Sequence, residues 1–211
     1  MRYYDRRHAG RELGRLLAAA PPAEAVVLAL PRGGVPVGYE VAAALGAPLD
    51  VVVVRKVGLP GEPEVGAGAV TEDGVVLLDL GLLRRVHLTP EDLAPQIDAA
   101  HAELTRRVAV YRAGRAVEPL AGRTAVVVDD GLARGVTALA AVRSVRARGP
   151  ARVVLAVPVA SREGERRVAV ECDEVVCPDV LDRFGAVGRY YRDFAQVDDD
   201  EVRSLLAASA S

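Results

Sequence analysis

Apolar residues in this chain fall into short uninterrupted runs that alternate with segments of helical periodicity. A run that is apolar at every position is typical of a parallel strand covered on both faces. Strands that alternate with helices along a chain indicate an α/β fold with a parallel sheet. We expect the strands of this sheet at residues 25–30, 49–55, 126–128, 152–157 and 174–177. We expect helices at about 9–20, 35–45, 137–148, 163–171 and 198–208.

Two stretches interrupt this alternation. Residues 58–68 contain four glycines and two prolines, which predicts a mobile loop, and short strands are expected beside it at 67–70 and 75–79. Further on, a threonine cap and a proline begin a segment whose apolar residues recur on one helical face. This pattern predicts a helical insertion at about 81–115. Since no internal repeat is visible, we expect one domain over residues 1–211.

The segment 126–137, VVVDDGLARGVT, carries the clearest chemistry in the chain. Its glycines let backbone N–H groups converge on an anion, and the start of the next helix adds partial positive charge. Asp129 and Asp130 would repel a phosphate, but they suit hydroxyl groups or a Mg²⁺ ion. Phosphate at one end and hydroxyls at the other describe a ribose 5-phosphate. The alternative is an ordinary strand-to-helix turn whose acids cap a helix.

This segment resembles the ribose-phosphate motif of the type I phosphoribosyltransferases, which bind 5-phosphoribosyl-1-pyrophosphate (PRPP). The family pattern is an apolar strand, two acids, two variable residues, a small or acidic residue, Thr or Ser, Gly, any residue and Thr. Arg134 departs from it, standing where the family usually has a hydroxyl for the 5-phosphate, although arginine also grips phosphate. The resemblance covers roughly residues 25–80 and 120–195. The matching residues are Val126, Val127, Val128, Asp129, Asp130, Ala133, Gly135 and Thr137.

The resemblance implies an open, twisted, mainly parallel sheet with helices on both faces, a helical insertion and a small C-terminal hood at about 178–211. It also implies roles for individual residues. Asp129 and Asp130 would hold the ribose hydroxyls directly or through a Mg²⁺ ion. The two carboxylates would bind that ion either directly or through water. The residues expected to bind PRPP are Gly33, Gly34, Gly131, Leu132, Ala133, Arg134, Gly135, Val136 and Thr137.

Two further signals fit a pyrophosphate. Residues 30–34, LPRGG, follow a strand and open a helix, which is another cradle for an anion. In the family this loop binds pyrophosphate through backbone N–H groups and a basic residue, and it contains an unusual cis peptide. Arg32 and Gly33 match that pattern. Lys56, the only lysine among 27 basic residues, follows a strand where a cation would offset pyrophosphate charge. A simple turn and a solvated lysine are the alternatives.

The flexible catalytic lid of the family corresponds to residues 58–68. The hood of the family covers the acceptor base, and aromatic residues gather in this part of the chain, where they can stack on a flat base. They can equally form a small core beneath the last helix. Ala133 stands where enzymes for 6-oxopurines carry an aspartate, which disfavours hypoxanthine and guanine and leaves other bases open. The candidate base-binding residues are Phe184, Tyr190 and Tyr191.

Composition excludes several classes of protein. A net charge of −2 gives no bulk attraction to nucleic acid or to a membrane surface, and no apolar run is long enough to span a bilayer. We expect no signal peptide. Two cysteines are too few for a disulfide framework, which favours reduced thiols in a cytoplasm. The scarcity of Asn, Gln and Met fits a heat-stable protein, although genomic base composition gives a similar bias.

The leading hypothesis is therefore a Mg²⁺-dependent enzyme that moves a 5-phosphoribosyl group from PRPP to a nitrogenous base and releases pyrophosphate. The alternative within the same fold is a non-catalytic regulator that senses PRPP or a nucleotide. An unrelated phosphohydrolase or dinucleotide enzyme is disfavoured, because no G-x-G-x-x-G follows a strand and no Ser-His-Asp or Cys-His set is visible. Members of the family are often dimeric, which leaves a homodimer open.

Overall fold

The computed structural model describes residues 2–209 and confirms the parallel α/β fold. Its central sheet has five parallel strands in the order β2–β1–β6–β7–β9. Each was expected from an apolar run, because strands buried on both faces leave no polar alternation. The strands are β1 (Ala25–Ala29), β2 (Leu49–Val51), β6 (Thr124–Val128), β7 (Arg152–Ala156) and β9 (Glu174–Val176).

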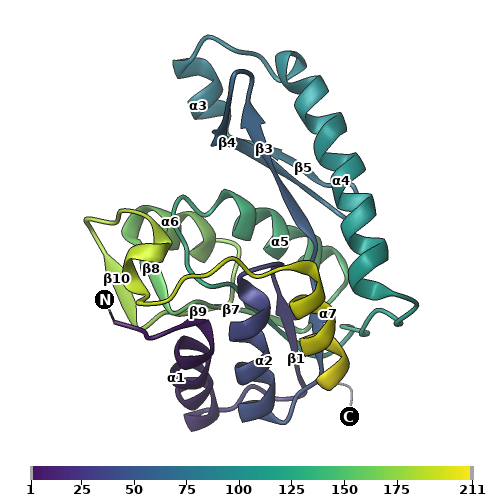
Figure 1. Cartoon of the computed structure of the whole chain (residues 1–211), viewed down its shortest axis with the longest axis vertical. Coiled ribbons are helices and arrows are strands. Elements are labelled where there is room, and N and C mark those ends of the chain that lie inside the picture. The colour runs from purple at the N-terminus through teal and green to yellow at the C-terminus, as the bar shows by residue number, and fades with distance from the viewer. Residues whose placement is uncertain (1, 210–211) are drawn as a thin grey trace.

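Helices cover both faces of this sheet (Figure 1). Successive residues of a strand point to opposite faces, so Val26 and Leu28 of β1 join one core while Val27 and Ala29 join the other. α5 and α6 cover the first face, and α1, α2 and α7 cover the second. Their boundaries lie within a few residues of the expected ones. The helices are α1 (Arg6–Ala19), α2 (Gly34–Leu45), α5 (Val136–Ala147), α6 (Arg162–Ala169) and α7 (Asp199–Ala208).

The order of the strands reverses between β1 and β6. From β1 the chain passes through α2 to β2 on one side, and from β6 it passes through α5 to β7 on the other. The loops after β1 and β6 therefore leave neighbouring strands and diverge to opposite faces. Ligands of open α/β sheets bind in the crevice that such a reversal creates.

A second sheet stands apart from the first and forms an arm, residues 54–112, that projects from the body of the molecule (Figure 1). Its antiparallel strands occur in the order β3–β4–β5, and α4 packs along them through residues such as Leu104. The expected helical insertion is present and belongs to this arm. The arm contains β3 (Val54–Leu59), β4 (Glu62–Thr71), β5 (Val76–Leu78), α3 (Leu80–Arg85), the 3₁₀ helix η1 (Glu91–Leu93) and α4 (Ala94–Arg112).

Two sequence expectations in this region are wrong. The strand expected at 49–55 is two strands, because the chain leaves the central sheet after β2 and enters the arm at β3. The mobile loop expected at 58–68 is a paired hairpin. Its glycines serve close approach, since a Cβ on Gly68 would lie 2.5 Å from the Leu77 carbonyl oxygen and one on Gly58 would lie 2.5 Å from that of Pro63.

The hood is built from both ends of the described chain. Within the hood, β10 (Asp179–Leu181) pairs in parallel with β8 (Val159–Ser161) of the neighbouring segment, and neither short strand was expected from the sequence. The N-terminal segment pairs with the hood, since the amide of Tyr3 donates to the Tyr190 carbonyl at 2.9 Å and the amide of Arg192 donates to the Tyr3 carbonyl at 2.9 Å. Residues 2–4 therefore pack as part of the hood, beside the 3₁₀ helix η2 (Val187–Tyr190).

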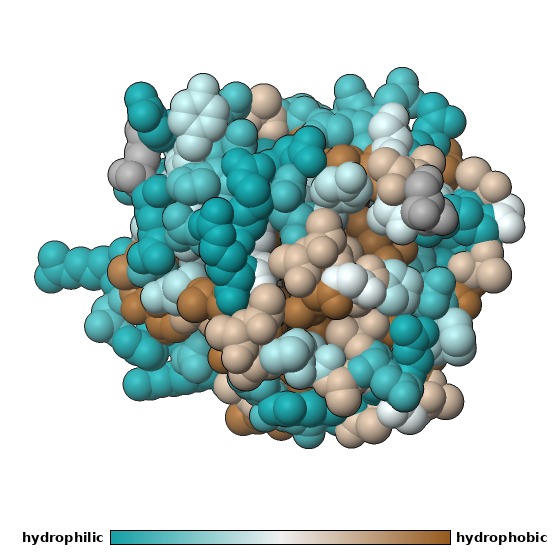
Figure 2. Space-filling model, turned by 90° about the horizontal axis from the view of Figure 1, so that it is seen from below, coloured by the Kyte–Doolittle hydropathy of each residue, from teal (hydrophilic) through white to brown (hydrophobic). Residues whose placement is uncertain are grey.

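Figure 2 shows the end of the molecule that faces away from the arm. Apolar side chains gather toward the middle of this face and also reach its lower and right edges, whereas hydrophilic side chains dominate its left side. Within residues 2–209, no helix combines the length and the apolar character needed to cross a bilayer.

Candidate functional site

The loops after β1 and β6 touch each other at the strand reversal. A Cβ on Gly33 would lie 2.1 Å from Oδ2 of Asp130, and a Cβ on Gly34 would lie 2.7 Å from the Val128 carbonyl oxygen. A side chain at either position would displace a neighbour in the loop after β6, namely the Asp130 carboxylate or the Val128 carbonyl. The Pro31–Arg32 peptide is cis, as the resemblance implied. The two glycine-containing segments singled out in the sequence therefore form one continuous surface.

Two adjacent carboxylates lie on this surface. The amide of Asp130 donates to Oδ1 of Asp129 at 2.8 Å, and Oδ2 of Asp130 accepts from Nε of Arg6 at 2.7 Å. Burial and the neighbouring charge of Asp130 raise the pKa of Asp129 well above its usual value. Burial also raises the pKa of Asp130, although Arg6 acts in the opposite direction. A hydroxyl group or a cation that reached Asp129 would stabilise its charged form.

The segment that follows the acids leads into α5 through a tight turn. Gly135 has a φ of +77°, which favours glycine, and no side chain caps the first turn of α5. Backbone N–H groups at an uncapped helix start are available to an anion. A pocket of about 310 Å³ opens here, lined by Asp129 and by every residue from 131 to 138.

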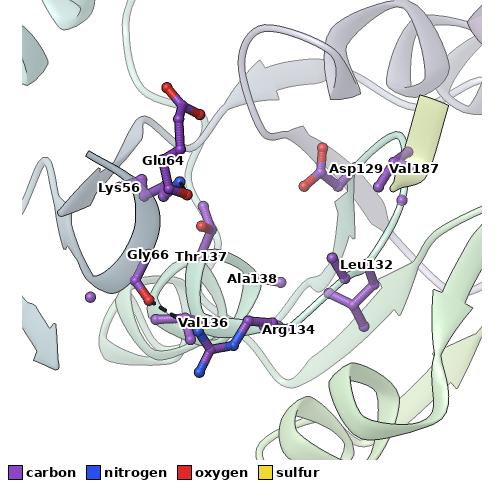
Figure 3. Close-up of a pocket in the computed structure, with 14 residues that line it drawn as sticks. Lys56, Glu64, Gly66, Asp129, Leu132, Arg134, Val136, Thr137, Ala138 and Val187 are labelled. Carbon is purple, nitrogen blue, oxygen red and sulfur yellow. Dashed lines mark hydrogen bonds between the residues drawn. The ribbon is translucent and has the colours of Figure 1, made fainter. Parts of the chain in front are cut away.

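The arm supplies the opposite wall of this pocket. Figure 3 shows Lys56 of β3 and Glu64 of β4 on one side and Asp129 on the other. The Lys56 ammonium donates to the backbone carbonyl of Glu64, which holds the long side chain along the hairpin. The pocket thus combines a cation, a helix start and a carboxylate, the three kinds of group that a sugar phosphate with a further phosphate requires.

Comparison with known proteins identifies the family. A model of the phosphoribosyl transferase domain matches residues 6–195. The chain belongs to the phosphoribosyl transferase domain family. Two proteins of Mycobacterium tuberculosis, "Putative phosphoribosyl transferase Rv0571c" of strain H37Rv and its counterpart MT0597 of strain CDC 1551, are each 49% identical over 206 residues, or 96% of this chain and 46% of theirs. The chain thus spans about half the length of these relatives.

Solved structures agree with this assignment. TT1426 from Thermus thermophilus is 45% identical, covers 100% of both chains and has a TM-score of 0.82. AQ2163 from Aquifex aeolicus is 13% identical, with 87% of this chain and 78% of that chain covered, and its TM-score is 0.53. The second comparison supports the fold alone. With the family match over residues 6–195, they confirm the type I phosphoribosyltransferase fold expected from the motif.

Arg32 lies at the edge of the site and not in the pocket lining. One guanidinium nitrogen of Arg32 is 3.8 Å from Oδ1 of Asp199, which begins α7. The same carboxylate oxygen accepts from the Tyr111 hydroxyl at 2.7 Å. The loop after β1 thus carries its basic residue, Arg32, at the expected position in this phosphoribosyl transferase domain. The guanidinium, however, is directed toward the junction of α4 and α7.

Arg134 also differs from its expected placement. Its guanidinium donates to Oδ2 of Asp79 at 2.8 Å and to the Gly66 carbonyl at 3.4 Å. The backbone of Arg134 belongs to the loop between β6 and α5, which we call the phosphate loop after the role that the sequence predicts for it, whereas its side chain reaches across to the arm (Figure 3).

The aromatic residues of the hood divide into two groups. Phe184 and Tyr190 are half-buried and stack on each other with ring centroids 5.0 Å apart. Tyr191 is only 2% exposed, packs beside Tyr3, and donates its hydroxyl to the Asp130 carbonyl at 2.6 Å. A ring buried in this way presents no open face to a base, so we withdraw Tyr191 from the base-binding set. Its hydroxyl instead supports the backbone at the two adjacent carboxylates, Asp129 and Asp130.

Sequence reasoning missed three residues of the site. Arg6 pairs with Asp130 from the start of α1, and nothing local in the sequence marks it. Val187 lines the pocket. A Cβ on Gly131 would lie 2.6 Å from the Val187 side chain, so this side chain packs on the Gly131 backbone. Asp79 binds Arg134, but the sequence predicts only that Asp79 ends a short strand. Each acts across a sequence separation that periodicity does not report.

The carboxylates suit a Mg²⁺ ion of the kind bound with substrate. Within residues 2–209, no group of three or more His, Cys, Asp or Glu side chains gathers into a metal site. Mg²⁺ commonly takes one or two carboxylates and completes its shell with substrate phosphates and water. Asp129, which lines the pocket, and Asp130 beside it supply that smaller set.

The turn at Gly135 allows a matched test of the phosphate loop. A Cβ there would lie 2.9 Å from the Gly164 carbonyl oxygen, whereas Gly61, with the same φ of +77°, has nothing within 4 Å. Both alanine variants incur left-handed backbone strain of about 1 kcal/mol. We expect Gly135→Ala to lower the free energy of urea unfolding by a further ~1 to 3 kcal/mol. Equal losses in the two variants would refute the close contact.

Proposed function

We propose that this chain transfers a 5-phosphoribosyl group from PRPP to a nitrogenous base and releases pyrophosphate. One observation supports this function above the others. The ribose-phosphate motif lies at the strand reversal, with the uncapped start of α5, Asp129 and Lys56 around one pocket. The family match over residues 6–195 agrees with it. Nothing in the charge balance favours a nucleic-acid partner.

The groups in the pocket match the charges of such a reaction. Breaking the bond at the anomeric carbon leaves positive charge on the ribose ring and negative charge on pyrophosphate. Backbone N–H groups of residues 133–137, with the Thr137 hydroxyl, would hold the 5-phosphate. Lys56 and the N–H groups near Gly33 would stabilise the leaving pyrophosphate. Arg32 would join them on leaving Asp199. Asp129 would accept hydrogen bonds from the ribose hydroxyls and favour charge on the ring.

A Mg²⁺ ion bound with the substrate would neutralise part of the pyrophosphate charge. Asp129 and Asp130 are the protein groups that would contact it, directly or through water. The hood would cover the base with Val187 and the stacked pair of Phe184 and Tyr190. The acceptor is proposed only as a nitrogenous base, since these contacts are apolar and specify no pattern of hydrogen bonds.

A PRPP- or nucleotide-sensing regulator of the same fold is the second candidate. One observation favours it: the position of the family's phosphate-binding hydroxyl is taken by Arg134, whose guanidinium is bound to Asp79. A sensor would bind PRPP and leave the anomeric bond intact. An enzyme would cleave that bond in the presence of its base.

The two candidates are separated by two measurements on the same protein. We expect isothermal calorimetry to detect PRPP binding when Mg²⁺ is present, and we expect pyrophosphate release with at least one member of a panel of adenine, xanthine, uracil and orotate. Binding without release for every base would favour the sensor. No detectable binding at millimolar PRPP would contradict both.

Lys56 offers a chemical test, because it is the only lysine in the sequence and is exposed in the free protein. An amine-directed reagent, followed by mass spectrometry, should modify it readily. At PRPP tenfold above the Kd, about nine-tenths of the sites are filled, so we expect modification to slow about tenfold. Ribose 5-phosphate is the matched control, since it lacks pyrophosphate and should leave Lys56 reactive. Equal protection by both ligands would place pyrophosphate elsewhere.

A further inference from the structure

Arg134 stands at the position where this chain departs from the motif of its family, and its side chain leaves the phosphate loop. The guanidinium extends toward Gly66 in β4 (Figure 3). It shares Oδ2 of Asp79 with Arg167 of α6, at 2.8 Å and 3.2 Å. The side chain of Asp79 is only 9% exposed. Asp79 therefore joins three segments that are distant in sequence.

Asp79 is also built into the arm. Its Oδ1 accepts from the amide of Leu82 at 2.9 Å and so caps α3. Its own amide donates to the Ala67 carbonyl at 2.7 Å. Burial acts to raise the pKa of Asp79, yet the Leu82 amide and the two guanidinium groups together hold it below its usual value. The carboxylate is therefore charged at neutral pH and binds both arginines.

The contact at Gly66 extends this connection to the pocket. A Cβ on Gly66 would lie 3.0 Å from Cε of Lys56, so the Lys56 side chain lies directly on the Gly66 backbone. The carbonyl of that same residue accepts from Arg134. The position of the pocket lysine thus depends on a peptide that the phosphate loop holds through Arg134.

We propose that Arg134 is a positioning residue, which fixes the arm against the phosphate loop through Asp79 and Gly66 and thereby places Lys56. Phosphate is left to the backbone N–H groups of residues 133–137 and to Thr137. The part of this inference that concerns ligand rests on the proposed function. The part that concerns the arm does not, because it is a property of the ligand-free protein.

Three variants test it. Asp79→Asn removes the charge that binds Arg134 but keeps a cap for α3, since Asn and Asp cap helices about equally well. Arg134→Thr restores the hydroxyl that the family has. The third is the double variant. Glu163→Gln is the matched control, because Glu163 is exposed and pairs at 3.2 Å with Nη2 of Arg167, whereas Asp79 pairs with Nη1.

The first measurement is amide hydrogen exchange of the ligand-free protein over residues 62–85. We expect about tenfold faster exchange in Asp79→Asn and in Arg134→Thr, no further increase in the double variant, and wild-type exchange in the control. Unchanged exchange in both single variants would overturn the proposal, whatever the ligand.

The second measurement is the Kd of Mg²⁺–PRPP by calorimetry. We expect Asp79→Asn and Arg134→Thr to weaken binding by a similar factor of about ten. If Arg134 instead gripped phosphate, Asp79→Asn would free its guanidinium and leave the affinity unchanged or higher, while Arg134→Thr alone would lose affinity. That pattern would overturn the positioning role. Absence of binding by the wild-type protein would contradict the proposed function, and the exchange result would still decide the role of Arg134.

Discussion

Replacement of Asp129 by Asn is expected to stabilise the ligand-free protein at neutral pH and to abolish its binding of Mg²⁺–PRPP. Burial and the charge of Asp130 raise the pKa of Asp129, so the charged form is disfavoured in the folded state. The neutral, isosteric Asn removes that penalty, and we expect the free energy of unfolding at pH 7 to rise by about 1 to 3 kcal/mol. Binding is lost because the charge needed by the ligand is gone.

The stability gained in Asp129→Asn should depend on pH, and the raised pKa of Asp129 sets the direction of that dependence. A carboxyl group whose pKa is raised by folding binds more protons in the folded state, so it stabilises the fold most at low pH. Its stabilising contribution is lost as the pH rises from about 4, the usual pKa of aspartate, through the raised value. The advantage of Asp129→Asn should therefore be large at pH 7 and vanish toward pH 4 in urea unfolding.

Asp182→Asn is the control for this experiment, because Asp182 is a hood carboxylate that is 81% exposed. We expect it to change the stability little at any pH. A destabilised Asp129→Asn protein at pH 7 would mean that the acid pair is satisfied without ligand, and the proposed role of Asp129 would be wrong.

Replacement of Arg6 by Ala is expected to lower the free energy of unfolding by about 2 to 4 kcal/mol, a loss typical of a partly buried ion pair that is left with one member. The Arg6 and Asp130 side chains are only 12% and 15% exposed. Arg6 also donates to the Ala195 carbonyl at 2.7 Å and lies 3.7 Å above the ring of Phe194. Its loss leaves two neighbouring carboxylates without a cation.

Arg7→Ala tests the neighbouring position on the same helix. The Arg7 side chain is 51% exposed and pairs with Glu40 at 2.6 Å, so its loss should cost less than about 1 kcal/mol. Urea unfolding of both variants at pH 7 and low salt measures the difference. Equal losses would mean that Arg6 contributes no more than a surface pair, and that the hood is held without it.

The central sheet was predictable because its physics is local. Runs such as Val126–Val128 are apolar at every position, and glycines such as Gly46 end the helices at the expected places. The arm was mispredicted for a reason that is also physical. Glycine and proline weaken local preference for any strand, and the hairpin of β3 and β4 owes its order to packing by α4 and to close backbone approach at Gly68, which sequence alone does not report.

The candidate site was likewise predictable only where its residues are close together in the sequence or carry a distinctive local signal. Motif residues from Asp129 to Thr137 are contiguous, so their spacing carried the inference, and Lys56 was marked by being the only lysine. Arg6 and Asp79 were missed because each meets its partner, Asp130 or Arg134, across more than fifty residues of sequence. The direction of the Arg134 side chain depends on a carboxylate that only the folded arm brings within reach.

The pairing of the N-terminal segment with the hood affects how this protein is made. Synthesis proceeds from the N-terminal to the C-terminal side, so Tyr3 and Tyr4 acquire their partners only when Arg192 and Asp193 have left the ribosome. Until then Arg6 lacks the contacts that hold its side chain over Phe194. A nascent chain can thus complete the central sheet while the hood beside the pocket is still unpaired, so the pocket is complete only after the hood segment has been synthesised.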